Sequence, residues 1–161
     1  MVLTKAQCNA LVKELYQGKT TERQQRLAIR NVTMASLMLN VGLRTTEVVN
    51  LVQSDLVRAG VLQNTLLVTR GLPRGHGTRL VDLDVGIKYF VRQMEQYWWV
   101  ADSDKPGNFA FYDMSPLKHI TSTQFRRIIN KAGMNALDYP VRPNMLRLTC
   151  KRLIGKDSFY S

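Results

Sequence analysis

The sequence is poor in the residues that bind metals and form disulfides. It contains two cysteines, Cys8 and Cys150, which lie far apart, and two histidines, His76 and His119. Zinc sites need clustered cysteine and histidine ligands, and disulfide-stabilised domains need more cysteines than these. We therefore expect a protein of the reducing cytoplasm, with no metal and no other cofactor.

Long hydrophobic runs are absent as well. The segment after Met1 lacks the basic and apolar regions of a secretory signal, and no stretch reaches the length of a membrane span. With 161 residues, 45% of them hydrophobic, the chain is long enough for one domain with its own core. We expect no membrane contact, and a single domain over residues 1–161 with a short tail over about 155–161.

Acidic residues are scarce relative to basic ones. There are 23 Lys and Arg against 12 Asp and Glu, a net charge of +11 and a pI near 10.1. The positive charge is concentrated in residues 1–80 and 118–161, whereas residues 84–117 are slightly acidic. Because solubility alone needs less charge, this excess indicates a polyanionic partner.

Most of the chain has the periodicity of amphipathic helices. Helices are expected at about 4–16, 21–40, 45–51, 85–99, 121–133 and 143–154, and we place a helix end at Gly133. Strands are expected at 65–69 and 79–83, joined by a glycine-rich hairpin loop, with a short strand or bridge at 108–112. The predicted class is α+β, mostly helical with a small antiparallel sheet.

One corner between two helices carries an arginine. An apolar helical run stops at Gly42, a residue suited to a left-handed helix end, and a new helical turn opens at Thr45 or Thr46. Arg44 lies at the junction, where its guanidinium fork suits phosphate oxygens. A solvated arginine at an ordinary helix corner is the simpler interpretation of this segment taken alone.

Four segments in this order resemble the catalytic domain of the tyrosine recombinases, the phage integrase family. The opening segment is Leu3–Gln7, and the first arginine motif, the most specific match, is Leu39–Glu47. The hairpin from Val68 to Leu83 is similar to the one that carries the family's lysine, and Pro143–Thr149 is similar to the second arginine motif. The resemblance covers about residues 3–155 and suggests kinship with the short fimbrial-type invertases, which are close to a catalytic domain alone.

The resemblance implies DNA strand transesterification, in which a phenol attacks a phosphodiester and two arginines stabilise the charge that develops on it. Arg44 and Arg147 match the two arginines. Arg70 stands at the place of the lysine, and Asn144 and Leu148 stand where the second motif usually has histidines. Arginine is a poor proton donor at neutral pH, and neither asparagine nor leucine exchanges a proton.

The resemblance also assigns roles near the end of the chain. Lys156 stands where the family has His or Trp, and Tyr160 is the tyrosine that follows the second motif. Because few residues follow Arg147, Tyr160 would have no helix to hold it. It is either a tail residue, which is the favoured interpretation, or a nucleophile supplied to the site of its own or of a neighbouring subunit.

Other basic residues are candidates for DNA contacts. They are Arg74 and Arg79 in the hairpin, Arg126 and Arg127 on a capped helix, and Lys151 and Arg152 in the last helix. The histidines are interpreted more simply, His76 as a solvated turn residue and His119 as a surface residue or phosphate donor. Trp98 and Trp99 are expected in the core.

Two functions follow from the resemblance. The first is a recombinase acting on double-stranded DNA near the nucleoid, as a homo-oligomer on DNA or in association with a complete recombinase. The second is a DNA-binding regulator or accessory subunit that keeps the arginines and has lost the reaction. Because each lost transition-state donor costs roughly a hundred- to a thousandfold in rate, the substitutions favour binding over catalysis.

Overall fold

Helices make up most of the protein. The computed structural model describes residues 2–99 and 107–154, and of residues 151–154 it describes the backbone alone. The helices are α1 (Lys5–Tyr16), α2 (Glu22–Ser36), the π-helix η1 (Leu37–Val41), α3 (Thr45–Val49), α4 (Gln53–Leu56), α5 (Val85–Tyr97), α6 (Ser122–Leu137) and α7 (Pro143–Ile154). The strands are β1 (Val57–Arg58), β2 (Val61–Leu62), β3 (Thr65–Val68) and β4 (Arg79–Asp82).

Three of the long helices begin with the same device. The hydroxyls of Thr4, Thr21 and Thr121 accept a hydrogen bond from the backbone N–H of a glutamine three residues further on. Each glutamine side chain accepts in return from the backbone N–H of its threonine. These capping boxes satisfy backbone donors that the first turn leaves unpaired, and they confirm the predicted starts of these helices.

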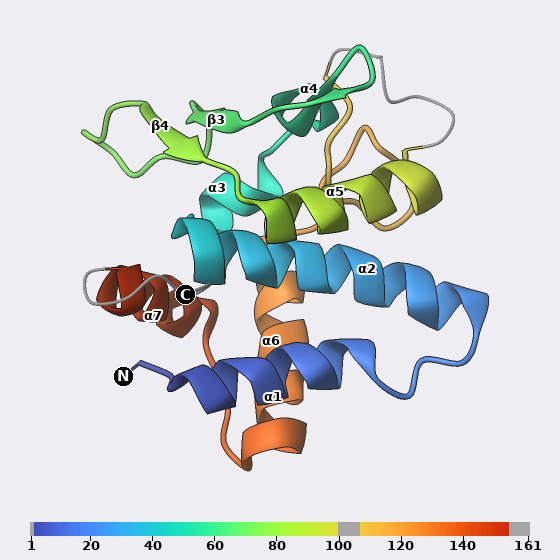
Figure 1. Ribbon diagram of the computed structural model, residues 1–161, viewed down its shortest axis with the longest axis vertical. Helices are drawn as coiled ribbons and strands as arrows, with labels where there is room; N and C mark the ends of the chain where they lie inside the picture. Colours follow the sequence, from blue (N-terminus) through green and yellow to red (C-terminus); the bar gives the residue numbers. More distant parts are fainter. Residues whose placement is uncertain (1, 100–106, 155–161) are drawn as a thin grey trace.

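The helices pack in layers around α2. In Figure 1, α5 runs along one side of α2 and α1 along the other, and α6 crosses α1. The core between them is apolar, and its largest fully buried side chains include Leu11, Met34, Phe111 and Phe125. Trp98 and Trp99 are buried in it as predicted. Helix α7 packs against η1 at the end of the layer where the N-terminus also lies.

Two antiparallel hairpins, β1–β2 and β3–β4, lie on the side of α5 that faces away from α2 (Figure 1). Strands β3 and β4 pair with Thr65 opposite Asp82 and Val68 opposite Arg79, which confirms the predicted hairpin. The structure has two separate two-stranded sheets rather than one, since β1 pairs with β2 and β3 pairs with β4. Residues 108–112 form isolated bridges, Val52 with Phe109 and Tyr112 with His119.

One predicted helix boundary was wrong. Helix α6 continues through Gly133 to Leu137 and ends at Asp138, which adopts the left-handed conformation. A Cβ at Gly133 would lie 2.6 Å from the Val141 side chain, so this glycine allows close packing and does not end the helix. The predicted helix over about 21–40 is present and stops at Gly42 as predicted, with its last residues forming the π-helix η1, and α3 ends at Val49.

The α+β class with predominant helix is confirmed. Within the described residues, none of the helices has the length and apolar character needed to cross a bilayer. The same part of the chain holds no group of three His, Cys, Asp or Glu that could bind a metal ion. The fold brings η1, α3, β4 and α7 together, and these elements carry the functional side chains.

Candidate functional site

The site is built on the corner between η1 and α3. Gly42 ends η1 in the left-handed conformation, with φ of 80°, and its N–H donates to the Met38 carbonyl at 3.2 Å. A Cβ at this glycine would lie 3.4 Å from Cys150 Sγ, so α7 packs directly against the corner. The chain then enters α3 with Arg44 as the N-cap residue.

A buried glutamate, Glu47, lies at the centre of the site. Its side chain is 0% exposed, and both of its carboxylate oxygens accept from arginines. The Arg44 backbone N–H donates to Oε1 at 2.7 Å, and Arg44 Nη1 donates to Oε2 at 3.2 Å. Arg79, from β4, donates in bidentate fashion, Nη1 to Oε2 at 2.5 Å and Nη2 to Oε1 at 2.8 Å.

These contacts fix the charge of the carboxylate. Burial by itself would raise the pKa of Glu47, but the hydrogen bonds and charges of Arg79 and Arg44 outweigh it and lower this pKa below the usual value. The hydrogen bond to Glu47 in turn raises the pKa of Arg79. Glu47 is therefore ionised at neutral pH, and it orients two guanidinium groups.

Arg147 joins this cluster from α7 as a third cation. Burial lowers the pKa of Arg147, and the positive charges of Arg44 and Arg79 lower it further, against an opposing effect of Glu47. Its Nε is buried and has no hydrogen-bond partner within residues 2–99 and 107–154. We refer to Arg44, Arg79, Arg147 and Glu47 as the arginine cluster. Three cations share one carboxylate here, so the cluster has positive charge left to bind an anion.

The loop between β3 and β4 closes over one edge of the cluster. Its first part is fastened to α3, since Thr46 Oγ1 donates to the Gly71 carbonyl at 2.7 Å. A Cβ at Gly71 would meet the Thr46 carbonyl oxygen at 2.1 Å, so only glycine permits this approach. Further along the loop, His76 Nδ1 lies 3.4 Å from Arg44 Nη2.

Arg70 makes contacts outside the arginine cluster. Its guanidinium pairs with Asp55 of α4, and its Nε donates to the Asn50 carbonyl at 3.0 Å. The structure thus places the residue at the family's lysine position against α4 and the end of α3. Arg79, predicted as a DNA contact, binds Glu47.

The other predicted residues lie outside the arginine cluster or outside the described side chains. Asn144, Arg74, Arg126 and Arg127 have exposed side chains. For Lys151 and Arg152 only the backbone of α7 is described, and Lys156 and Tyr160 lie outside the described residues.

His119 does not have a free ring. Its Nδ1 lies 2.6 Å from the Ile120 carbonyl, and the ring packs edge-on against Phe109 at 4.9 Å between centroids. The side chain is half-buried, as part of the bridge that Tyr112 and His119 form. These contacts give it a packing role in the loop before α6.

The sequence analysis did not identify two residues of the site, Glu47 and His76. Glu47 had a usable signal, because a glutamate three residues after the N-cap position is the acceptor of a capping box. His76 had none, since nothing in the spacing of a glycine-rich loop indicates which side chain turns back over α3.

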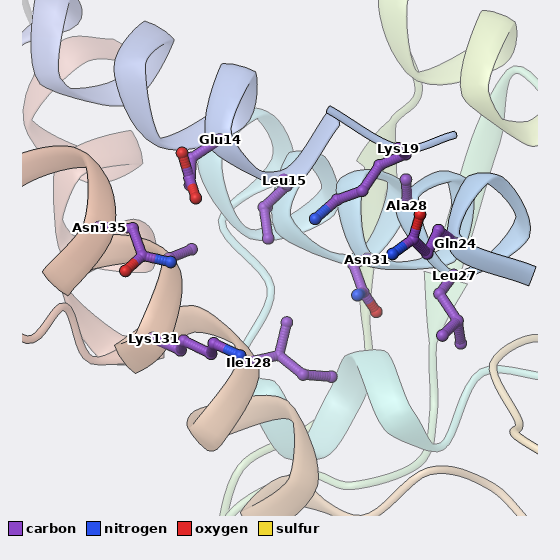
Figure 2. Close-up of a pocket in the computed structure, with 11 residues that line it drawn as sticks. Glu14, Leu15, Lys19, Gln24, Leu27, Ala28, Asn31, Ile128, Lys131 and Asn135 are labelled. Atoms are coloured by element: carbon purple, nitrogen blue, oxygen red, sulfur yellow. The ribbon is translucent and has the colours of Figure 1, made fainter. Parts of the chain in front are cut away.

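A cleft lies apart from the cluster, between α1, α2 and α6. Figure 2 shows Glu14, Lys19, Asn31 and Lys131 among the residues that line it. Its lining mixes one carboxylate, two ammonium groups, amides and aliphatic side chains, and contains none of the clustered arginines. The arginine cluster therefore remains the better candidate for binding an anion.

Comparisons with known proteins give a family match for the sequence and several solved structures with a similar fold. Residues 1–157 match the model of the phage integrase family. The XerA recombinase has a similar structure, with a TM-score of 0.67 and 18% identity over 98% of this chain and 52% of that chain. The Tn1549 transposon integrase in complex with circular intermediate DNA gives 0.68 and 17% over 96% of this chain and 52% of the other.

A third similar structure is the XerH site-specific recombinase bound to its palindromic difH substrate, with a TM-score of 0.65 and 19% identity over 95% of this chain and 41% of that one. The chain thus spans about half the length of XerA and of the Tn1549 integrase, and less of XerH. A comparison with curated protein sequences gave no match. At these identities the similarity establishes a shared fold.

Proposed function

Because the chain belongs to the phage integrase family, as its sequence motifs indicated, we propose that it binds double-stranded DNA and acts in site-specific recombination or integration. Its fold is that of the recombinases to which it is similar. The Tn1549 integrase and XerH structures both contain DNA, which supports DNA as the partner. A cytoplasmic, nucleoid-associated location is part of this proposal.

The observation that carries the proposal is the unbalanced charge of the arginine cluster. Arg44 is held by Glu47 but keeps Nη2 directed away from the carboxylate, toward His76. Arg147 Nε is buried without a hydrogen-bond partner in the described part of the chain. A phosphodiester oxygen would satisfy both groups, since two guanidinium forks from different elements can bind one phosphate.

Further contacts would extend along the DNA backbone. Arg126 and Arg127 are exposed on α6, and Arg74 is exposed in the hairpin loop, so each is available to a phosphate. Lys151, Arg152 and Lys156 follow Arg147 in the sequence and would add to the positive charge. Asn144, one turn before Arg147 on α7, would donate a hydrogen bond to the same phosphate region. Assembly on DNA as a homo-oligomer, or with a complete recombinase, belongs to the same proposal.

Binding of duplex DNA at several ionic strengths tests this function. We expect affinity to fall steeply with salt, because each cation that binds a phosphate releases a counterion. Fluorescence anisotropy with a labelled duplex between low and physiological salt measures the slope. A flat response, or no binding at low salt, would contradict the proposal.

A second candidate is a DNA-binding regulator that does not cleave. The favouring observation is Arg70, which is bound to Asp55 and to the Asn50 carbonyl at the position where the family uses a lysine as proton donor. Asn144 and Leu148 likewise replace groups that exchange protons. A protein of this kind would keep the arginine cluster for binding alone.

Covalent trapping separates the two candidates. The same duplex, nicked so that cleavage cannot reverse, is incubated with the protein and run on a denaturing gel. A covalent band that Tyr160→Phe abolishes assigns the enzyme and Tyr160 as its nucleophile. Salt-sensitive binding without a band assigns the regulator.

A further inference from the structure

Thr149 carries a buried hydroxyl on α7 that the proposed function does not use. The residue is 0% exposed. Its Oγ1 accepts a hydrogen bond from the Leu3 backbone N–H at 2.8 Å, in a buried contact between residues 146 positions apart. The same hydroxyl donates to the Met145 carbonyl at 2.6 Å. Thr149 therefore ties α7 to the segment that precedes α1.

The Leu3 N–H depends on this hydroxyl. Leu3 is itself buried and lies just before Thr4, the N-cap residue of α1, so its N–H is outside the hydrogen bonds of the helix. A buried backbone donor that lacks an acceptor destabilises the folded protein, so the contact is kept wherever the fold is kept. It holds α7 at a fixed place relative to the start of α1.

The positions of Thr149 and Arg147 on α7 link this contact to the arginine cluster. Leu146 and Cys150, four residues apart, lie on one buried face of the helix, and Cys150 packs against Gly42 at the η1–α3 corner. Since successive residues are about 100° apart around a helix axis, Arg147 lies on one side of this face and Thr149 on the other. The hydrogen bond of Thr149 therefore limits rotation of α7 about its axis, which would move Arg147 relative to the rest of the cluster.

Arg147 is positioned by its helix. The Glu47 carboxylate accepts its hydrogen bonds from Arg44 and Arg79, and Arg147 Nε is buried without a partner in the described part of the chain. Burial lowers the pKa of Arg147, and the charges of Arg44 and Arg79 lower it further, so these cations repel one another. The contacts that fix α7 have to hold Arg147 in place against this repulsion.

We propose that Thr149 is a positioning residue for DNA binding, whose hydroxyl holds α7 against the segment before α1 so that Arg147 faces the same phosphate as Arg44. This inference rests on the proposed function and adds a residue that is too deeply buried to contact DNA itself. It makes the affinity for DNA depend on a contact with the start of the described chain.

The test compares the affinities of variants for a labelled duplex at fixed salt, corrected for the folded fraction measured by circular dichroism. Thr149→Val removes the hydroxyl and nearly keeps the shape of the side chain. We expect it to weaken binding about three- to tenfold in the wild-type background, part of the contribution of one charge-assisted contact. When Arg147→Ala is already present, the loss should be less than about twofold. Thr149→Ser, which keeps the hydroxyl, should bind within about twofold of wild type.

A second variant breaks the same contact from the other side. Leu3→Pro has no N–H to donate and leaves Thr149 intact, and its loss of affinity should likewise depend on Arg147. The salt dependence gives a further readout, because losing one phosphate contact reduces the slope of log affinity against log salt by about one. Thr149→Val should shift this slope toward that of Arg147→Ala, which a general loss of stability would not do.

Thr33 provides a matched control. It is also 0% exposed, and its Oγ1 donates to the Ile29 carbonyl at 2.7 Å, but it lies in α2. Thr33→Val should leave the affinity of the folded protein within about twofold of wild type. The positioning role would be overturned by equal losses in Thr33→Val and Thr149→Val, by no loss in Thr149→Val, or by a loss that is the same with and without Arg147. Absence of DNA binding by the wild-type protein would instead overturn the proposed function.

Discussion

At the scale of single residues, Glu47 organises the arginine cluster. A carboxylate that is 0% exposed accepts four hydrogen bonds, two from Arg44 and two from Arg79. Without it, Arg44, Arg79 and Arg147 would repel one another in a partly buried site. The glutamate thus serves two purposes, because it stabilises the fold and aims Arg44 outward.

Replacing this carboxylate should cost considerable stability. We expect Glu47→Gln to lower the free energy of unfolding by about 3 kcal/mol at neutral pH, because it leaves buried cations without their partner. Glu95→Gln, which breaks the more exposed pair with Arg92, should cost about 0.5 kcal/mol. Urea unfolding of the two variants and the wild-type protein measures both effects, and equal losses would contradict the role given to Glu47.

The same carboxylate predicts how stability depends on pH. The pKa of Glu47 is lowered in the folded protein. The ionised carboxylate therefore makes its full contribution to the free energy of unfolding above the ordinary glutamate pKa of about 4.3. It is lost as the pH falls through the lower pKa of the folded state. The stability gap between wild type and Glu47→Gln should therefore narrow only in acid, and a gap that narrows between pH 8 and pH 6 would show that another group is responsible.

At the scale of elements, the β3–β4 hairpin is positioned by its contact with α3. The Gly71 backbone approaches Thr46 more closely than any side chain would allow, and the Thr46 hydroxyl donates to the Gly71 carbonyl. Arg79 fixes the other end of the loop on Glu47. These contacts hold both ends of the β3–β4 loop against α3.

Two glycine substitutions isolate this contact. Gly71 and Gly75 both have positive φ, of 72° and 82°, so alanine at either position should cost about 1–2 kcal/mol in backbone strain. Only at Gly71 would the new Cβ meet backbone, since nothing lies within 4 Å at Gly75. We expect Gly71→Ala to lower the melting temperature and the DNA affinity clearly more than Gly75→Ala. Equal effects would mean that the close approach does not hold the hairpin.

The elements also show which features a sequence can predict. The threonines at the starts of α1, α2 and α6 predicted where these helices begin. The left-handed helix end at Gly42 predicted that Arg44 lies at a corner between two helices. Gly133 was wrongly predicted to end a helix. A glycine is needed there because Val141 packs against it, and only the folded chain brings these two residues together. The neighbours of Glu47 and His76 depend on the same long-range packing, which local patterns do not encode.

At the scale of the whole molecule, the fold joins the two basic parts of the sequence. Helix α7, near the end of the described chain, packs against η1 and places Arg147 beside Arg44. The start of the chain is tied to the same helix, since the Leu3 N–H donates to Thr149 Oγ1 at 2.8 Å in a buried contact. One arginine of the second basic segment is thereby brought beside two arginines of the first, Arg44 and Arg79.

The most direct test of the account is a double-mutant cycle on duplex affinity with Arg44→Ala, Arg147→Ala and the double variant, with Arg92→Ala as a control outside the cluster. If Arg44 and Arg147 bind one phosphate, each single variant weakens binding more than Arg92→Ala does. The double variant then loses less than the sum of the two, by about 0.5–3 kcal/mol. Strictly additive losses, or losses no larger than that of Arg92→Ala, would contradict a shared phosphate site.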